Sequence, residues 1–181
     1  MRFFAAEPTP IRELRFLTRT PKRLFAALAS QTQLEALHVK WGDYDGLSVL
    51  SGLTQLRSLT LGGASAVRTI EPLTALQNLT RLDIDHLRHV HDLSALAALP
   101  ALTSLTVGGN WASFVNLHLD SLTFLRSMPQ LQQLVLHTTI VDDHDYSPLL
   151  ALPALTSVRV MNTRGMNPTI EELKAALPWD S

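Results

Sequence analysis

The stretch "LTRLDIDHLRHVHD" (residues 79–92) gathers side chains that could bind a metal or transfer a proton. Ten consecutive positions in it hold three aspartates and three histidines, namely Asp83, Asp85, His86, His89, His91 and Asp92. Carboxylates and imidazoles are common metal ligands, and paired carboxylates act as acid and base in glycoside hydrolysis. Either chemistry requires the side chains to converge on one point, so the elements that carry them decide whether it occurs.

The chain repeats the pattern LxxLxL, in which L stands for a large apolar residue. The pattern starts seven times, at Ile11, Leu34, Leu56, Leu79, Leu102, Leu131 and Leu155, and successive starts are 23, 22, 23, 23, 29 and 24 residues apart. The alternation within LxL predicts a strand with one buried face, and the apolar residues three apart that precede it suit a 3₁₀ return. Neither piece buries its apolar edge alone, so the units must stack.

This pattern resembles that of leucine-rich-repeat proteins of the short bacterial type, with units of about 22 to 23 residues, over essentially the whole chain. The resemblance implies an α/β fold, a right-handed leucine-rich-repeat solenoid of about seven repeats. Its parallel strands would line the concave face, and short helical or 3₁₀ returns would cover the convex face. The asparagine usual at the ninth position of each unit is largely missing, since units two to seven read Gly42, Ala64, Leu87, Asn110, Thr139 and Thr163.

The sequence predicts a single domain over residues 1–181 with a cover at each end of the stack. Its parts are an N-terminal capping unit with a helix (1–33), core repeats (34–163) and a C-terminal capping helix (164–181). In the first cap, Thr20 and Pro21 fit the N-cap and first helical position, with Leu24, Phe25 and Leu28 buried. In the second, "TIEE" from Thr169 to Glu172 is a capping box.

Composition and charge narrow the class of protein. The chain has no cysteine, its first ten residues contain an apolar run of only four, and no stretch approaches the length of a membrane helix. We therefore expect a cytoplasmic protein without disulfides, thiolate metal sites or membrane contact. Residues 1–40 hold seven Lys/Arg and three Asp/Glu, a balance of +4, whereas residues 41–181 hold eight and thirteen, a balance of −5. The acidic larger part argues against nucleic acid and for a basic partner.

The repeat places the polar residues of the first stretch. Leu82, Ile84 and Leu87 point inward, so Asp83 and Asp85 point outward from one strand, about 7 Å apart. The histidines that follow are interleaved with inward residues and fan around the outside of a turn. They are therefore not expected to converge, and we predict no metal and no cofactor at this stretch. Catalysis by the two aspartates remains an alternative, although an arc offers no deep pocket to raise one pKa.

The outward strand positions predict a binding surface. Asp83 and Asp85 lie between strands that present only Ser, Thr and Gly, which leaves the carboxylates clear of any cross-strand cation, with Arg81 beside them. Aromatic and acidic residues follow the neighbouring strands, and the longest unit carries an insertion at 111–117. We expect Trp41 and Trp111 to be exposed, whereas Tyr44 and Tyr146 could be either buried or exposed. The predicted partner-binding residues are Arg81, Asp83, Asp85, His86, Trp41, Asp43, Asp45, Trp111, His137, Asp142, Asp143 and His144.

These features favour a non-enzymatic module that binds one protein with a basic surface through its concave face and ascending loops. Among proteins that the pattern resembles, short cytosolic members without an attached domain imply an inhibitor, an immunity protein or an adaptor. An acidic surface would suit the neutralisation of a basic toxin such as a nuclease. Two alternatives are a regulatory or adaptor subunit similar to the leucine-rich-repeat regulators of phosphatases, and an enzyme that uses Asp83 and Asp85.

Overall fold

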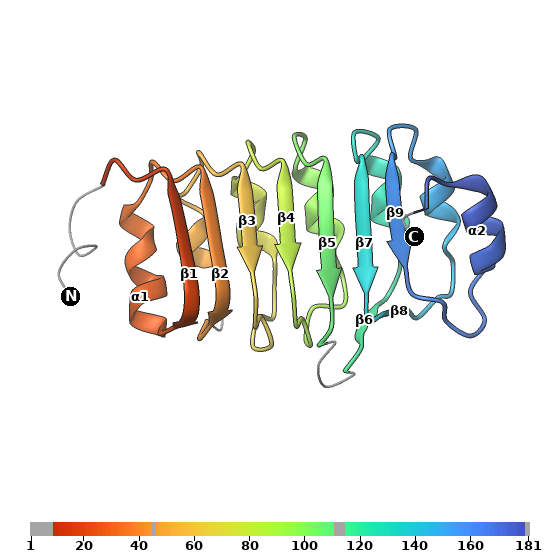
Figure 1. Ribbon diagram of the computed structural model, residues 1–181, viewed down its shortest axis with the longest axis horizontal. Helices are drawn as coiled ribbons and strands as arrows, with labels where there is room; N and C mark the ends of the chain where they lie inside the picture. The colour runs from red at the N-terminus through yellow and green to blue at the C-terminus, as the bar shows by residue number, and fades with distance from the viewer. Residues whose placement is uncertain (1–8, 45, 111–114, 180–181) are drawn as a thin grey trace.

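The parallel strands of the protein form one layer, and short helical returns form a second layer behind it (Figure 1). The computed structural model describes residues 9–44, 46–110 and 115–179. The strands are β1 (Glu13–Thr20), β2 (Ala36–Gly42), β3 (Ser58–Leu61), β4 (Arg81–Ile84), β5 (Ser104–Gly108), β6 (Leu117–Leu119), β7 (Gln133–His137), β8 (Thr139–Val141) and β9 (Ser157–Val160). The helical segments are α1 (Lys22–Ala26), α2 (Ile170–Ala176) and the 3₁₀ turns η1 (Ala27–Ser30), η2 (Ser48–Leu50), η3 (Glu71–Ala75), η4 (Ser94–Ala98), η5 (Thr123–Ser127) and η6 (Ser147–Ala151).

The main sheet follows the repeat. Within the described residues it has seven strands in the order β1-β2-β3-β4-β5-β7-β9. All of its neighbouring strands run parallel, and equivalent repeat positions face each other, as Leu59 faces Leu82 and Leu82 faces Leu105. The parallel strands and their register, predicted from LxxLxL, are confirmed.

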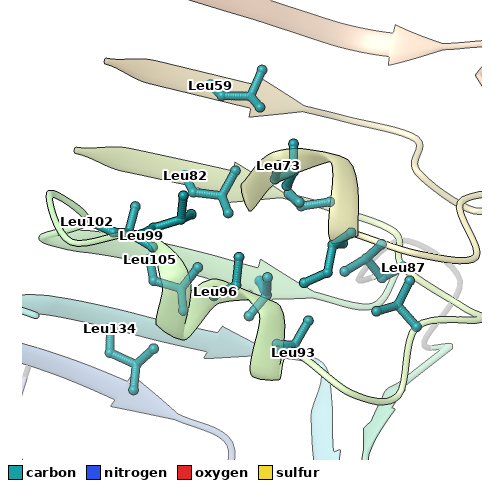
Figure 2. Packing of buried hydrophobic residues seen from close by; sticks show 14 of the residues in the cluster. Leu59, Leu73, Leu82, Leu87, Leu93, Leu96, Leu99, Leu102, Leu105 and Leu134 are labelled. Carbon is teal, nitrogen blue, oxygen red and sulfur yellow. The ribbon is translucent and has the colours of Figure 1, made fainter. Parts of the chain in front are cut away.

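The core lies between this sheet and the 3₁₀ turns (Figure 2). Ile70, Leu73, Leu76 and Leu79, each three residues apart, are buried, and the N–H of each of the last three donates to the carbonyl of the one before at 2.9 Å. A 3₁₀ turn brings residues i and i+3 to the same side, so this spacing aims every leucine at the strands. Leu82 and Leu105, on two adjacent strands, have no exposed surface.

The ends of the stack differ from its centre. In the first unit Ile11, Leu14 and Phe16 are only partly buried. The prediction for the first helix was wrong by one residue, because Pro21 is the N-cap of α1 and Thr20 is a buried residue at the end of β1. Of the residues expected beneath that helix, Phe25 and Leu28 are buried and Leu24 is half-buried.

At the other end the predicted capping box is confirmed. The Thr169 hydroxyl accepts from the Glu172 N–H at 3.3 Å, and the Glu172 carboxylate accepts from the Thr169 N–H at 2.8 Å. These reciprocal bonds satisfy backbone donors that would otherwise lack partners at the start of α2.

Threonines tie successive units together at the end of the strands opposite the missing asparagines. The hydroxyls of Thr80, Thr103 and Thr156 donate to the carbonyls of Arg57, Thr80 and Gln132 at 2.9, 3.2 and 3.1 Å. Each threonine occupies the second position of its LxxLxL pattern and bonds the same position of the preceding unit. This ladder supplies side-chain contacts between the turns that the absent asparagines do not provide.

The longest unit forms a second, smaller sheet. Strands β6 and β8 pair in parallel, with His118 opposite Ile140, and lie beside the lower end of β7 in Figure 1. Just before β6, Asn110 and Val115 exchange backbone hydrogen bonds of 2.8 and 3.1 Å. The extra residues therefore leave the main sheet intact, because β5 and β7 remain in register.

Candidate functional site

The concave face carries two aspartates at its centre. Asp83 lies in β4, with Thr60 on β3 and Thr106 on β5 as its register partners. Asp85 follows the last residue of β4, and its N–H donates to the carbonyl of Leu61 at 3.0 Å. The alternation of the repeat thus sends both carboxylates to the same face, among short side chains.

A histidine reaches Asp85 from two strands away. The Nε2 atom of His137, at the end of β7, lies 3.9 Å from Oδ1 of Asp85. Gly108, on the intervening β5, faces His137, and a Cβ at Gly108 would lie 2.3 Å from the ring carbon Cε1. The adjacent strands present only short side chains here, as expected, and the imidazole of His137 reaches toward Asp85 across the space that Gly108 leaves open.

One oxygen of the Asp85 carboxylate is buried. Its Oδ1 atom is buried and has no hydrogen-bond partner within the described residues, although its side chain as a whole is 31% exposed. A buried acceptor without a donor costs free energy, so a partner's cation would approach the exposed part of this carboxylate.

Asp83 is also held in a partly buried environment. Burial raises the pKa of Asp83 and the charge of Asp85 acts in the same direction, while His137, His38 and Arg81 oppose the rise. We refer to His38, Asp83, Asp85 and His137 as the Asp–His cluster. It joins residues of β2, β4 and β7 on one face of the sheet.

A small pocket lies at the edge of the sheet where β1 to β4 end. This edge pocket has a volume of about 310 Å³ and is lined by Arg19, Trp41, Gly42, Asp43, Gly63, Ser65 and His86. Trp41 is 45% exposed, which confirms its expected exposure, and its ring meets the His86 ring edge-on with centroids 6.5 Å apart. The predicted residues Trp41, Asp43 and His86 are therefore brought together.

The charge of Asp43 is already paired. Arg19 Nη2 and Nε donate to Asp43 Oδ1 at 2.7 and 2.9 Å. The sequence analysis did not connect these residues. The only available signal was their equivalent place at the ends of adjacent strands, where Arg19 faces Trp41 in the register of β1 and β2. Asp43 consequently adds little net negative charge to the pocket.

His86 has an unusual backbone. Its φ of 66° lies in the left-handed region, which a residue with a Cβ seldom adopts. Its Nε2 atom lies 3.2 Å from the Asn110 amide nitrogen, and its Nδ1 atom is buried without a hydrogen-bond partner in the described structure. His86 thus packs at the wall of the edge pocket and does not extend freely from a loop.

The predicted residues of the sixth unit lie elsewhere. Asp142, Asp143 and His144 follow β8 on the return that leads to η6. Asp142 Oδ1 lies 2.7 Å from His118 Nδ1, and Asp143 Oδ1 accepts from the Asp145 N–H at 3.0 Å. These contacts are local to the β6–β8 side of the molecule, so the predicted surface divides into two parts.

The structure describes some of the remaining predicted aromatic and acidic residues but not others. Tyr44 and Tyr146 are buried, with 3% and 1% of their surface exposed, which decides a question that the sequence left open. Asp45, Trp111 and the first part of the 111–117 insertion lie outside the described residues.

The other histidines of the first stretch lie on the outer side of the turn. His91 Nδ1 contacts the carbonyl of His118 at 2.9 Å, and His89 is exposed. Among residues 9–44, 46–110 and 115–179, no three His, Cys, Asp or Glu side chains are arranged to hold a metal ion. Within the same ranges, each helix is too short or too polar to cross a bilayer.

Comparisons with known proteins address the fold. No protein-family model matches the sequence, and a search of curated proteins finds no relative. Solved structures do match. The leucine-rich-repeat protein LIC12759 of Leptospira interrogans has a TM-score of 0.69 at 16% identity, over 94% of this chain and 42% of that one.

Two internalins of Listeria monocytogenes are similar as well. Internalin F has a TM-score of 0.58 at 20% identity over 85% of this chain and 49% of its own, so the present chain spans about half its length. Internalin C2 has a TM-score of 0.54 at 23% identity, over 83% of this chain and 81% of its own. Together with the observed sheet and returns, these matches confirm that the chain has the leucine-rich-repeat fold.

Proposed function

We propose that this leucine-rich-repeat solenoid is a non-enzymatic module that binds one protein partner with a basic surface. The centre of the interface is the pair Asp83 and Asp85 on the concave face. The observation that carries the proposal is the Asp85 carboxylate, held beside a second carboxylate with one buried oxygen that lacks a hydrogen-bond donor among the described residues.

A cationic side chain of a partner would relieve two costs at once. It would oppose the repulsion between Asp83 and Asp85, and it would donate hydrogen bonds to their oxygens. Arginine suits this role because its planar guanidinium offers several N–H groups to carboxylates. The sheet around the pair presents Thr60 and Thr106, which leave room for a long side chain to approach.

The edge pocket extends the proposed interface to the ends of the strands. Trp41 offers a large, partly exposed ring beside the space lined by Gly42 and Gly63. Tryptophan is enriched among residues that dominate binding energy, especially where it borders a pocket that a partner can fill. Trp41 is therefore the proposed aromatic anchor, and Trp111 is a second anchor predicted from the sequence.

Similar folds support a binding role. One further match is the plant peptide hormone receptor RGFR1 in complex with RGF2, with a TM-score of 0.60 at 13% identity over 83% of this chain and 24% of the receptor. In its finer form, the proposal is a cytoplasmic inhibitor or immunity protein that neutralises a basic toxin such as a nuclease. The alternatives are a regulatory or adaptor subunit and an enzyme that uses Asp83 and Asp85, for which the concave hollow of about 250 Å³ beside Asp83 would be the substrate site.

The proposal is tested with a variant that keeps shape but removes charge. Asp83→Asn/Asp85→Asn bait should capture less of the partner from source-cell extract than wild-type bait. The matched control is Glu71→Gln/Glu171→Gln, which removes two charges from exposed positions on η3 and α2. Titration of the purified partner should show at least a tenfold loss of affinity for the first variant, with a weaker salt dependence, and little change for the control.

Two further baits examine the aromatic anchors. Trp41→Ala and Trp111→Ala should each weaken the same complex, by about 2 kcal/mol if the ring is a hot spot. Equal affinity of wild type and the double asparagine variant would remove the concave carboxylates from the interface. Turnover of a substrate that the double asparagine variant loses would instead favour the enzyme.

A further inference from the structure

We infer that His137 makes binding at the Asp–His cluster depend on pH, because its protonated ring competes with a partner's cation for Asp85. This inference rests on the proposed function, since it concerns the regulation of the same site. Neutral His137 leaves the charge of Asp85 available, and imidazolium offsets it from within the chain.

The geometry provides the competition. His137 Nε2 lies 3.9 Å from Asp85 Oδ1, beyond hydrogen-bond distance but within the range of an ion pair, and both side chains are 31% exposed. Asp85 Oδ1 has no hydrogen-bond partner in the part of the chain that the structure describes. His137 Nδ1 lies 3.2 Å from Thr138 Oγ1, so the neutral ring can already carry its proton on Nε2, and what protonation adds is a positive charge beside Oδ1.

Gly108 is what allows the ring to reach across β5. The space above Gly108 is occupied by the His137 ring, with Cε1 and Nδ1 at 2.3 and 2.4 Å from where a Cβ would lie. Any larger residue at position 108 would push the imidazole away from Asp85. Gly108 therefore permits the approach of His137, on β7, to Asp85, which follows β4.

The charged groups that act on Asp83 together with His137 come from several strands. β4 contributes Arg81, β2 contributes His38, and Asp85 follows β4, while Arg159 of β9 lines a shared hollow with His137. Tyr44 lies beneath the sheet, where burial and then the charge of Asp85 raise its pKa, so it stays neutral throughout the relevant range. The outward positions of β3 and β5 in this region are Thr60, Gly62, Thr106 and Gly108, which do not titrate.

The direction of the effect follows from the charges. Histidine is the residue type whose charge changes between pH 5 and 8, and protonation of His137 or His38 would add a positive charge near the two carboxylates. Each added charge weakens the attraction of the cluster for a cation, and we expect about a tenfold loss of affinity from His137.

The test uses a defined cationic probe. An acetylated, fluorescently labelled tetra-arginine peptide keeps its charge between pH 5.5 and 8.0, so any change in binding belongs to the protein. Fluorescence anisotropy at low ionic strength would compare wild type, His137→Gln, His38→Gln, Asp83→Asn/Asp85→Asn and the control His89→Gln, an exposed histidine on the outer side of the turn. A thermal melt of each variant at both pH values verifies folding.

The expected result is about a tenfold or greater loss of wild-type affinity at pH 5.5, with His89→Gln unchanged from wild type. His137→Gln should retain a loss of no more than about threefold, which reports the remaining share of His38. Gly108→Ala should also weaken the pH dependence, but its added Cβ would overlap the His137 carbonyl oxygen, 2.4 Å away, as well as the ring, so its melt is compared with that of wild type.

The outcomes separate the two ideas. If His137→Gln keeps the full pH dependence while Asp83→Asn/Asp85→Asn loses binding at pH 8.0, the role of His137 is overturned and the proposed site stands. If wild type does not bind the peptide at pH 8.0, or the double asparagine variant binds it equally well, the cationic site itself is overturned and the inference with it.

Discussion

Tyr44 donates its phenolic hydrogen to the carbonyl of Gly62 at 2.5 Å. A side chain of the second unit is thus hydrogen-bonded to the backbone of the third. The ring reaches that carbonyl through the space above Gly42, where a Cβ would lie 1.6 Å from Cε1 of Tyr44. Gly42 stands at the ninth repeat position, usually asparagine in the family that the pattern resembles. The buried Tyr44 therefore links the two turns by a side-chain hydrogen bond, although it does not occupy the asparagine position itself.

Replacing Tyr44 by Phe should lower the free energy of unfolding by about 0.5 to 1.5 kcal/mol. The loss should stay in this range because the Gly62 carbonyl also accepts from the Gly42 N–H at 3.2 Å and keeps one partner. Urea denaturation measures the change. Identical denaturation midpoints for Tyr44→Phe and wild type would mean that the hydroxyl contributes nothing to stability.

Gly42→Ala should be more harmful, by about 1 to 3 kcal/mol, because the added methyl group overlaps the Tyr44 ring. If the overlap is the cause, Gly42→Ala should cost less in a Tyr44→Leu background, where the ring is gone. A double-mutant cycle from denaturation curves isolates this coupling. Strict additivity of the two substitutions would show that the ring does not set the requirement for glycine.

Truncation of the central leucines should strongly lower the free energy of unfolding. Leu82→Ala and Leu105→Ala each remove a fully buried side chain, and each should cost about 2 to 5 kcal/mol with a sharp fall in Tm. Leu17→Ala, at an exposed position of β1, is the matched control and should change Tm little. Unchanged melting of both core variants would contradict the assigned register.

Asp83→Asn should stabilise the free protein at neutral pH. Burial raises the pKa of Asp83, so the folded chain binds this proton more readily than the unfolded chain does. The resulting penalty is fully present above the folded pKa and disappears below the unfolded value of about 3.9. Because the side chain is partly solvated, the gain at pH 7 should be no more than about 1 kcal/mol and should shrink as the pH falls.

Asp145, whose pKa is lowered and not raised, provides the control for the pH dependence of Asp83→Asn. Hydrogen bonds from Ser147 lower the pKa of Asp145, so ionised Asp145 contributes stability at neutral pH that is lost on acidification. Asp145→Asn should therefore lower the free energy of unfolding at pH 7. Stabilisation by both substitutions would point to a general effect of net charge and not to the surroundings of Asp83.

Untagged protein should contain much less than one equivalent of zinc or iron. His86 lines the edge pocket whereas His89 and His91 line a different hollow, and among the described residues no three His, Asp or Glu side chains are arranged to hold a zinc ion, which requires ligands about 2.0 to 2.2 Å from a common centre. Elemental analysis after purification without chelator measures the content. One zinc per chain, lost on His89→Gln/His91→Gln, would overturn the prediction.

Much of the fold is readable from the sequence because burial imposes a strict period. Leu79, Leu82 and Ile84 had to point inward once their equivalents in six other units were recognised, and the parallel sheet follows from stacking. The pairing of β6 with β8 was not predicted, since His118 and Ile140 lie in units of different length and share no repeated pattern.

The candidate site was less predictable than the fold. Asp83 and Asp85 could be assigned to the concave face, because the side chains of a strand alternate between its two faces. The approach of His137 to Asp85 depends on a long side chain that crosses a glycine on a third strand, and the pairing of Arg19 with Asp43 depends on side-chain rotamers. Periodicity specifies which face a residue occupies but not how far its side chain leans across that face.

Asn110 and Val115, which are hydrogen-bonded to each other, mark a place in the longest unit where the chain could be replaced. Their two backbone hydrogen bonds hold the ends of the intervening segment together, while β5 and β7 keep their register independently of it. Segments of other lengths and sequences could therefore be grafted between these residues without disturbing the concave strands. Selection or design could therefore alter the residues between positions 110 and 115, and with them the binding specificity, while the stacked core stays the same.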